Sequence, residues 1–367
     1  MIKYIFTVAL LLVTIQASED IAMTTNDIRA YPLNETRGYI HATYDRVNDT
    51  LDLFNVRASQ LGNAQNYGAI GDAVGYALSL GYGLRPYLSL HYNFEQLHIN
   101  YIEEKLKNRQ HELYLKLNLY YNPTAFIESY AVDFGFVRNS AADLAIRRES
   151  TLNSMLRKIR PDGNFRLEND VFYYGENLSL SFGDTPPYLL IENMADYGYF
   201  IRLIGGTRIK RSILNMYAGI RTTSIDSDIV LRPYNSIVQA AIDEFGDLNL
   251  GRHEKSLFGG FSWTIEWQKF LFDLGYEYIR LFDRGEGLGE NNDNHIIKAA
   301  IGYPVNDRML LYIGGKLMLH QFNGVIPYLY NKYTQSKYDK KYGYARFGVV
   351  YNFDADSWLV PEGYSSY

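Results

Sequence analysis

The chain has 367 residues, a formal net charge of −5 and no cysteine. Its 47% hydrophobic and 21% charged residues exclude an intrinsically disordered chain. The absence of cysteine excludes disulfides, thiolate metal sites and a cysteine nucleophile, and the mild acidity argues against a nucleic-acid binder, which needs a basic face. The unusual feature is the 15% aromatic content, with 34 Tyr and 19 Phe.

The first 18 residues have the pattern of a secretory signal peptide. Lys3 precedes an apolar run from Ile5 to Ile15, and small residues follow at Ala17 and Ser18. We expect residues 1–18 to be removed and residues 19–37 to form a short periplasmic segment. That segment is short and polar, so we expect no plug from it. No later stretch has the length and hydropathy of a transmembrane helix.

The rest of the chain alternates between apolar and polar residues. In Leu88–Glu95 every even position is apolar and every odd position is polar, and similar segments recur down the chain. Neighbouring side chains of a strand point to opposite faces, so each segment has one apolar and one polar face. Two environments produce this pattern, a soluble β-sandwich and a transmembrane barrel.

Three features favour the barrel. The alternating segments have the length of about ten residues that a tilted strand needs to cross a bilayer, which is longer than strands of soluble sheets. Their polar faces carry small and charged residues, and short connections alternate with long ones, as in bacterial outer-membrane barrels. We therefore predict an all-β, transmembrane, antiparallel up-and-down barrel over residues 38–353, with short helices in external loops.

The connections predict about fourteen strands, with both chain ends on the short-turn side, and twelve or sixteen also fit. The expected strands are 38–45, 73–84, 86–95, 111–121, 127–138, 169–183, 188–194, 196–208, 212–222, 256–267, 270–280, 294–304, 308–320 and 342–353. The first strand and 188–194 have the weakest patterns. The expected long loops are 46–72, 96–109, 139–168, 223–255, 281–293 and 321–341.

The last expected strand ends in an apolar face with an aromatic residue, formed by Phe347, Val349, Tyr351 and Phe353. This pattern resembles the C-terminal strand of Gram-negative outer-membrane β-barrel proteins, porins and uptake channels among them. The resemblance is to a class, and it implies recognition by the barrel assembly machinery and a bacterial outer-membrane location. In that class the aromatic residue is normally the chain terminus, whereas residues 354–367 follow here, which we expect to be a periplasmic tail.

Aromatic side chains on the apolar faces are expected at the two membrane–water interfaces, where the ring meets lipid and its polar atom meets water. The expected belt residues are Tyr76, Tyr82, Tyr130, Trp263, Trp267, Tyr276, Tyr278 and Tyr351.

Charged residues on the polar faces are expected to line the lumen, with six acids and six bases. They are Glu95, Glu112, Lys116, Asp133, Arg202, Arg221, Glu266, Asp273, Glu277, Lys298, Lys316 and Arg346. Equal numbers of the two signs predict no marked ion preference. The pattern leaves open a transverse field in a pore and cross-strand ion pairs that fill a closed barrel.

Two loops contain helical apolar stripes. One is Leu152, Met155, Leu156 and Ile159; the other is Ile237, Val238, Ala241, Ile242 and Phe245, with Asn235 or Ser236 as its cap. The first lies among basic residues that could narrow the barrel and select anions, bind lipopolysaccharide phosphates at the rim, or be solvated. These are Arg147, Arg148, Arg157, Lys158 and Arg160.

No catalytic set is expected. Ser89, His91 and Asn93 share one polar face and resemble, in reversed order, the His-x-Ser arrangement of outer-membrane phospholipases. The sites of those enzymes face lipid, whereas this set faces the lumen, so we predict no enzyme activity. We also expect no cofactor and no metal site.

The pattern as a whole favours a passive channel or uptake pore for small solutes. The alternatives are a non-transporting structural or adhesive surface barrel with a plugged lumen and, least favoured, a barrel hydrolase acting on lipid. The expected partners are outer-membrane lipid, lipopolysaccharide, the assembly machinery and a small solute, and no nucleic acid.

Overall fold

The computed structural model describes residues 28–46, 70–101, 104–159, 165–175, 178–181, 187–231, 250–283, 292–320, 322–331 and 341–355. The expected signal peptide, the second helical stripe, Arg160 and most of the C-terminal tail lie outside these residues. No helix among the described residues has the length and hydropathy needed to cross a membrane.

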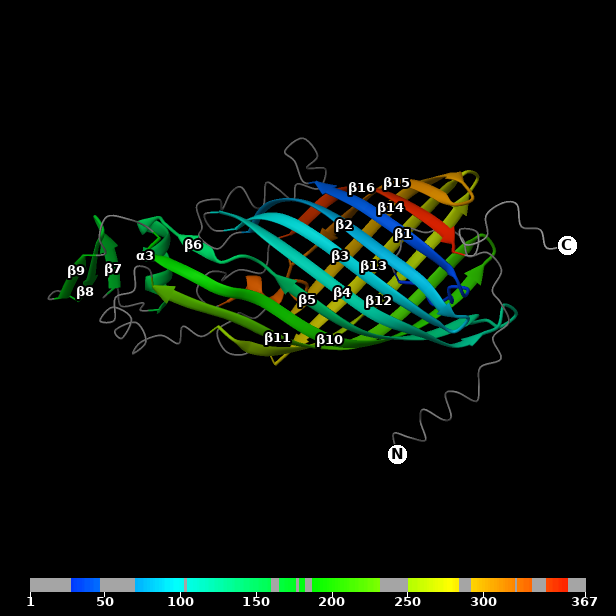
Figure 1. Ribbon diagram of the computed structural model, residues 1–367, viewed down its shortest axis with the longest axis horizontal. Helices are drawn as coiled ribbons and strands as arrows, with labels where there is room; N and C mark the ends of the chain where they lie inside the picture. Colours follow the sequence, from blue (N-terminus) through cyan, green and yellow to red (C-terminus); the bar gives the residue numbers. More distant parts are fainter. Residues whose placement is uncertain are drawn as a thin grey trace, which may run out of the picture.

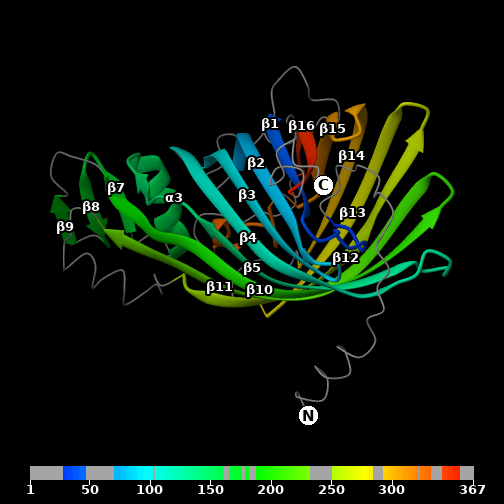
Figure 2. The same ribbon diagram turned by 45° about the vertical axis from the view of Figure 1, so that its right-hand side comes forward.

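Twelve antiparallel strands form one closed barrel (Figures 1 and 2). Each wall strand pairs with the wall strands that precede and follow it along the chain. The first wall strand pairs with the last, and Arg37 lies opposite Asp354. The wall consists of β1 Arg37–Arg46, β2 Ile70–Arg85, β3 Leu88–Tyr101, β4 Glu104–Tyr121, β5 Ser129–Ser140, β10 Leu189–Ile209, β11 Ser212–Leu231, β12 Arg252–Trp267, β13 Phe270–Phe282, β14 Asp293–Asn306, β15 Met309–Met318 and β16 Tyr342–Asp354.

The expected barrel is therefore correct in class, but its strand number is twelve and not fourteen. The expected strand 169–183 is not part of the wall, because its residues form β8 Val171–Tyr174 and β9 Leu178–Ser181 of a separate sheet. The expected strands 188–194 and 196–208 are one strand, β10. A register shift between Glu192 and Ala195, with Asn193 at φ 55°, interrupts its alternation and imitates a strand boundary in the sequence.

The expected loop 96–109 is also wrong. β3 continues to Tyr101 and β4 begins at Glu104, so these strands form one long hairpin. β11 and β12 likewise extend into the expected 223–255 loop. Polar residues in these extensions hide the strand pattern, because the hairpins rise beyond the apolar surface of the barrel.

A small extension lies at the long-loop end of the barrel. We call this extension the distal platform. It contains α3 Glu149–Ile159, β7 Phe165–Glu168, β8 and β9 (Figure 1). The short strand β6 Leu144–Ile146 pairs with the start of β10 and so belongs to the barrel sheet. The expected helical stripe is confirmed, with Leu152, Met155 and Leu156 buried. α3 contacts β7, where Asn153 exchanges two hydrogen bonds with the backbone of Leu167.

A hydrogen bond fixes the start of β10 to the platform. The Tyr188 hydroxyl donates to Asp170, and this bond raises the pKa of Tyr188 to about 12. Because Asp170 follows β7 and Tyr188 directly precedes β10, the bond joins the platform to the barrel wall.

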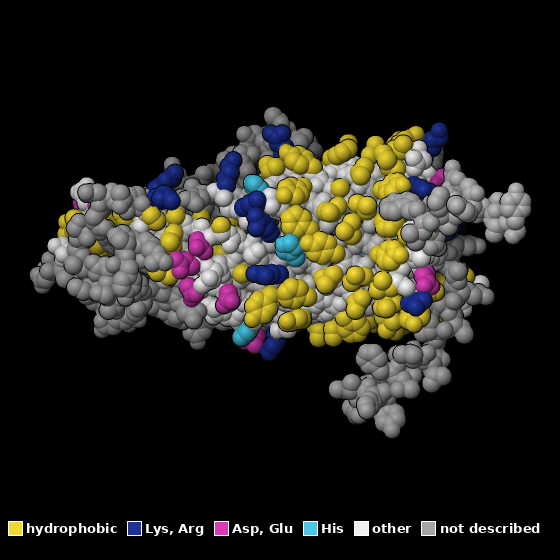
Figure 3. Space-filling view, viewed as in Figure 1, with side chains coloured by type: hydrophobic (Ala, Val, Ile, Leu, Met, Phe, Trp, Pro, Cys, Tyr) yellow, Lys and Arg dark blue, Asp and Glu magenta, His cyan; other side chains and the backbone are white. Residues whose placement is uncertain are grey.

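Burial alternates along the wall strands. In β10, for example, Asp196, Gly198, Phe200 and Arg202 are buried while Tyr197, Tyr199, Ile201 and Leu203 are exposed. The exposed set gives the barrel a continuous apolar outer surface over its turn-side half (Figure 3). The inward set carries the polar and charged residues together with several aromatic rings.

Inward glycines make room for those rings. A Cβ on Gly135 would lie 2.3 Å from the Phe200 ring, and one on Gly81 would lie 2.2 Å from the Tyr39 ring. Large side chains of one strand therefore lie across the glycine of the next strand, and the barrel interior is packed with side chains at these levels.

Candidate functional site: a lumen closed by two inserted segments

Residues 28–34 lie inside the barrel at its short-turn end; we call them the N-terminal insert. Ala30 is its centre and is fully buried. Its amide donates to Asn215 Oδ1 at 2.9 Å, and its carbonyl accepts from Asn118 Nδ2 at 2.5 Å and from Ser129 Oγ at 2.8 Å. Three strands thus bind the backbone of one residue through inward side chains.

The flanking residues of the N-terminal insert make similar contacts. The Lys116 ammonium donates to the Arg29 carbonyl at 2.6 Å, and Ser262 Oγ donates to the Ile28 carbonyl at 3.1 Å. The Tyr31 hydroxyl donates to Glu128 at 3.0 Å.

This insert is the largest difference from the sequence-based expectation. Residues 19–37 are short and polar, and no plug was expected from them. The segment needs no hydrophobic pattern, because the lumen satisfies its backbone groups with Asn, Ser and Lys side chains. The feature of the sequence that could have predicted the insert is the set of inward amides and hydroxyls near the short turns, among them Asn118, Ser129 and Asn215.

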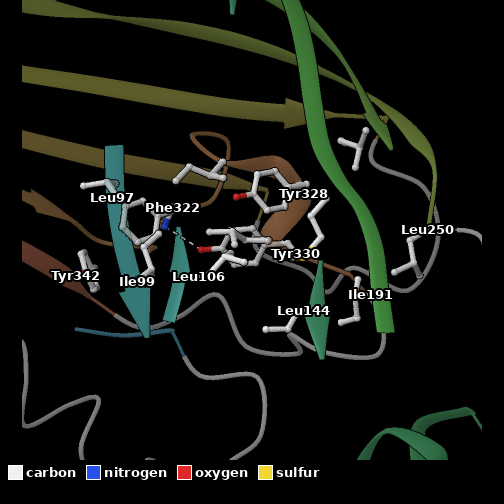
Figure 4. Close-up of a cluster of buried hydrophobic side chains, with 14 of the residues drawn as sticks. Leu97, Ile99, Leu106, Leu144, Ile191, Leu250, Phe322, Tyr328, Tyr330 and Tyr342 are labelled. Carbon is white, nitrogen blue, oxygen red and sulfur yellow. Dashed lines mark hydrogen bonds between the residues drawn. The ribbon is translucent and has the colours of Figure 1, made fainter. Parts of the chain in front are cut away.

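A second segment, residues 322–331, enters from the long-loop end; we call it the loop insert. It contains the short helix η2 Pro327–Leu329. Phe322, Ile326, Tyr328 and Tyr330 are buried against an apolar cluster that includes Leu97, Ile99, Leu106, Leu144, Ile191, Leu250 and Tyr342 (Figure 4).

Polar side chains of the wall hold the loop insert. Arg221 donates to the Gly324 carbonyl, and Arg252 donates to the Pro327 carbonyl at 3.0 Å. The Tyr328 hydroxyl donates to Asn108 at 2.6 Å, and its amide donates to Asp196 at 3.2 Å. The insert is therefore bound from β4, β10, β11 and β12.

Between the two inserts lies a buried charge cluster. Asp133 forms an ion pair with Lys116 at 3.0 Å and accepts hydrogen bonds from Arg202 at 2.5 and 2.8 Å. All three side chains are almost fully buried and come from the adjacent strands β4, β5 and β10. Arg202 also lies over the Tyr114 ring, 5.3 Å from its centroid. The cluster carries two positive charges against one negative charge.

The other expected lumen charges lie at inward positions of their strands, but several meet partners that the sequence did not indicate. Arg346 makes two bonds to Asp45 at 2.7 and 2.8 Å, and Glu277 accepts from Tyr217 at 2.8 Å. Asp273 accepts from Thr264. Glu95, Glu112, Lys298 and Lys316 are inward and partly buried, while Glu266 is exposed near a short turn. Asp45 was missed because its strand had a weak pattern.

The expected basic loop cluster does not lie in the lumen. Arg147, Arg148 and Arg157 are exposed on the distal platform, and the side chains of Lys158 and Arg160 are outside the described set. The segment that narrows the lumen from this end is the loop insert, and its cationic holders are Arg221 and Arg252 of the wall.

The Ser89–His91 pair is hydrogen-bonded. Ser89 Oγ lies 2.8 Å from His91 Nε2, and Tyr39 OH lies 3.1 Å from His91 Nδ1. The His91 ring stacks on Tyr114 with centroids 4.6 Å apart. Ser89 and His91 are 1% and 3% exposed, so the pair is enclosed by the packed interior; Asn93 lies inward on the same strand.

The expected belt aromatics all lie on the outward face. Tyr82, Tyr130, Trp263, Trp267 and Tyr351 lie toward the short turns, whereas Tyr76, Tyr276 and Tyr278 lie toward the long loops. The terminal motif Phe347, Val349, Tyr351 and Phe353 is likewise outward on β16, which closes the barrel against β1.

No family model matches the chain, and no curated protein matches it in sequence. Solved structures do match over most of its length. The translocator domain of the autotransporter NalP from Neisseria meningitidis has 8% identity and a TM-score of 0.42, covering 88% of this chain and 90% of that one. An outer membrane channel from Pseudomonas putida F1 has 9% identity and a TM-score of 0.42, covering 90% and 100%. The KdgM porin has 8% identity and a TM-score of 0.36, covering 86% and 99%. The chain thus resembles outer-membrane β-barrels in structure, without belonging to a matched family.

The buried charge cluster predicts a large effect of Asp133→Asn. The substitution leaves Lys116 and Arg202 without their counter-charge in the interior, which costs about 3–5 kcal/mol. Urea titration, followed by the shift in gel mobility between folded and unfolded barrel, should show a lower unfolding midpoint. Asp307→Asn, at an exposed turn position, is the matched control and should change stability by under about 0.5 kcal/mol. Equal midpoints for the two variants would contradict the role of the cluster.

Proposed function

We propose that the chain is a bacterial outer-membrane protein whose apolar outer surface contacts lipid. The wall has no unpaired strand edge, because β1 pairs with β16, as a bilayer requires of a spanning sheet. Large apolar side chains stand exposed around the wall, for example Leu203 at 53% and Ile313 at 68%. Outward tyrosine and tryptophan near both ends of the strands support the same placement.

A charge placed on this surface tests the membrane location. Leu203 is central in the apolar part of β10, between Tyr199 and the turn after Ile209. Leu203→Arg should destabilise the barrel by about 2–4 kcal/mol in lipid, and Ile209→Arg, near the turn, by about 0–1 kcal/mol. Folding titrations into lipid vesicles measure both values. Two equal, small effects would indicate that water covers this surface.

We further propose that the barrel is a channel for small polar solutes that is closed at rest. The main observation that supports this proposal is the binding of Ala30 by Asn118, Ser129 and Asn215. These contacts join inward side chains to a peptide and are not part of the strand ladder. The N-terminal insert can therefore leave without breaking the wall, and its departure exposes amides and hydroxyls suited to a water-filled path.

The width of the barrel agrees with this proposal. Twelve strands lie between the eight-stranded barrels, which side chains fill, and the sixteen-stranded porins, which keep an aqueous channel. Paired charges of both signs, such as Arg346 with Asp45, predict a weak ion preference for the open state. We propose no catalytic role for Ser89 and His91, since both are enclosed.

Gly206→Val tests the closed channel without altering a polar group. A Cβ at Gly206 would lie 2.7 Å from the Ala30 Cβ, so a larger side chain expels the N-terminal insert. We expect the open probability in planar bilayers to rise about tenfold, equivalent to about 1.4 kcal/mol. The control is the neighbouring Gly205→Val, because a Cβ there has its first neighbour at 3.7 Å.

Release of the insert can be followed directly, because the chain has no cysteine. A Leu33→Cys label should react faster with a soluble thiol reagent in the Gly206→Val background. If the label reacts faster but the bilayer records stay silent, the channel proposal fails.

That outcome would favour the second candidate, a non-transporting surface barrel. The observation in its favour is the distal platform, in which α3 and β7–β9 lie at the long-loop end of the wall (Figure 2). In this role the loops are the working part and the two inserts stiffen the barrel.

A further inference from the structure

Basic side chains gather on the outward face of β3, β4 and β5, toward the long loops. Figure 3 shows Lys, Arg and His side chains along the loop-side border of the apolar surface. The exposed members are His98, Lys105, Lys107, Arg109 and Arg138, and His111 is half-buried among them. We call these six residues the basic border patch.

The strand register brings the members of the patch together. Lys107 lies opposite His98 on β3, and His111 lies opposite Arg138 on β5. Lys105, Lys107 and Arg109 alternate along β4, so successive cations are about 7 Å apart on one face. The patch is therefore a continuous basic surface across three strands, with its four Lys and Arg charges on β4 and β5.

Within the part of the chain that the structure describes, no carboxylate forms an ion pair with Lys107, Arg109 or Arg138. The comparable outward cation on β12, Lys255, is paired with Asp283 at 3.2 Å. Like charges packed at this spacing repel one another, so an external anion would stabilise the patch.

Directly beside the patch begins the apolar surface. His111 accepts or donates a 2.8 Å hydrogen bond with Tyr92 and lies 5.1 Å from the Phe94 ring. Phe136 is the next outward residue on β5 after Arg138, one step toward the turns. This order, aromatic rings and then cations, matches the order of acyl chains and then headgroups along a bilayer normal.

We propose that the basic border patch binds the phosphate groups of lipid A in the outer leaflet. The inference rests on the proposed outer-membrane location, with the short turns in the periplasm. Arg109 and Arg138 supply planar donors that bind phosphate in two-point contacts, and Lys107 adds a point charge. The acyl chains of the same molecule then lie along Leu113, Phe134 and Phe136. The arginines of the distal platform are not needed for this site.

The test compares lipid binding by the folded full-length barrel and a charge-neutral variant. The variant is Lys107→Gln/Arg109→Gln/Arg138→Gln, and native mass spectrometry from detergent measures its affinity for bisphosphorylated lipid A. A matched control, Lys210→Gln/Arg211→Gln/Lys269→Gln, removes three exposed cations at the short turns. We expect the patch variant to bind at least about tenfold more weakly than wild type, and the control to bind like wild type.

Two further lipids define the ligand. Dephosphorylated lipid A should bind wild type as weakly as bisphosphorylated lipid A binds the patch variant. Phosphatidylglycerol should bind more weakly than lipid A and respond less to the variant. Unchanged lipid A binding by the patch variant, equal binding of dephosphorylated lipid A, or equal binding of phosphatidylglycerol would each overturn the proposal. Bilayer records and the Leu203→Arg titration do not depend on this patch, so they report on the proposed function separately.

Discussion

The pairing of β1 with β16 is the constraint on which the rest of the structure depends. Nine residues of β1 also pair with β2, so the first strand is hydrogen-bonded on both sides along almost its whole length. Closure removes the two free edges that a twelve-stranded sheet would otherwise present to its surroundings. Closure also creates a lumen, and every polar residue that faces the lumen must then form a hydrogen bond there or contact water.

The inner face meets part of this requirement in three layers. Backbone groups of the N-terminal insert satisfy amides and hydroxyls near the turns, and carbonyls of the loop insert satisfy Arg221 and Arg252 near the loops. Between them, Asp133 joins Lys116 and Arg202. The two inserts differ in chemistry, since the first is held mainly by hydrogen bonds and the second also buries Phe322, Tyr328 and other apolar side chains. Opening from the turn side consequently requires the loss of fewer apolar contacts than opening from the loop side.

The outer face is organised along the same axis. Apolar side chains cover the part near the turns, rings of Tyr92 and Phe94 follow, and the basic border patch comes next. Strands β3 and β4 continue beyond this border to Tyr101 and Glu104. The hydrogen-bonded ladder is thus longer than the apolar surface, and the residue types on the outer face, not the strand ends, mark the boundary between two environments.

The sequence by itself determined the class of fold, because a strand that separates two environments must alternate, and Leu113–Asn118 or Ala345–Phe353 alternate visibly. It also determined which residues face inward, once a strand was recognised, and it located α3 from the spacing of Leu152, Met155 and Leu156. It failed at Asn193, where one irregular residue reverses the alternation within β10. It also failed in the β3–β4 hairpin, where the apolar residues Leu97, Ile99 and Leu106 face inward and polar residues face outward, the reverse of the pattern nearer the turns. Only the tertiary structure decided the number of strands and the occupancy of the lumen. The contacts of Ala30 with Asn118 and Asn215 link positions 88 and 185 residues apart, and such long-range pairing of single polar groups leaves no periodic pattern in the chain.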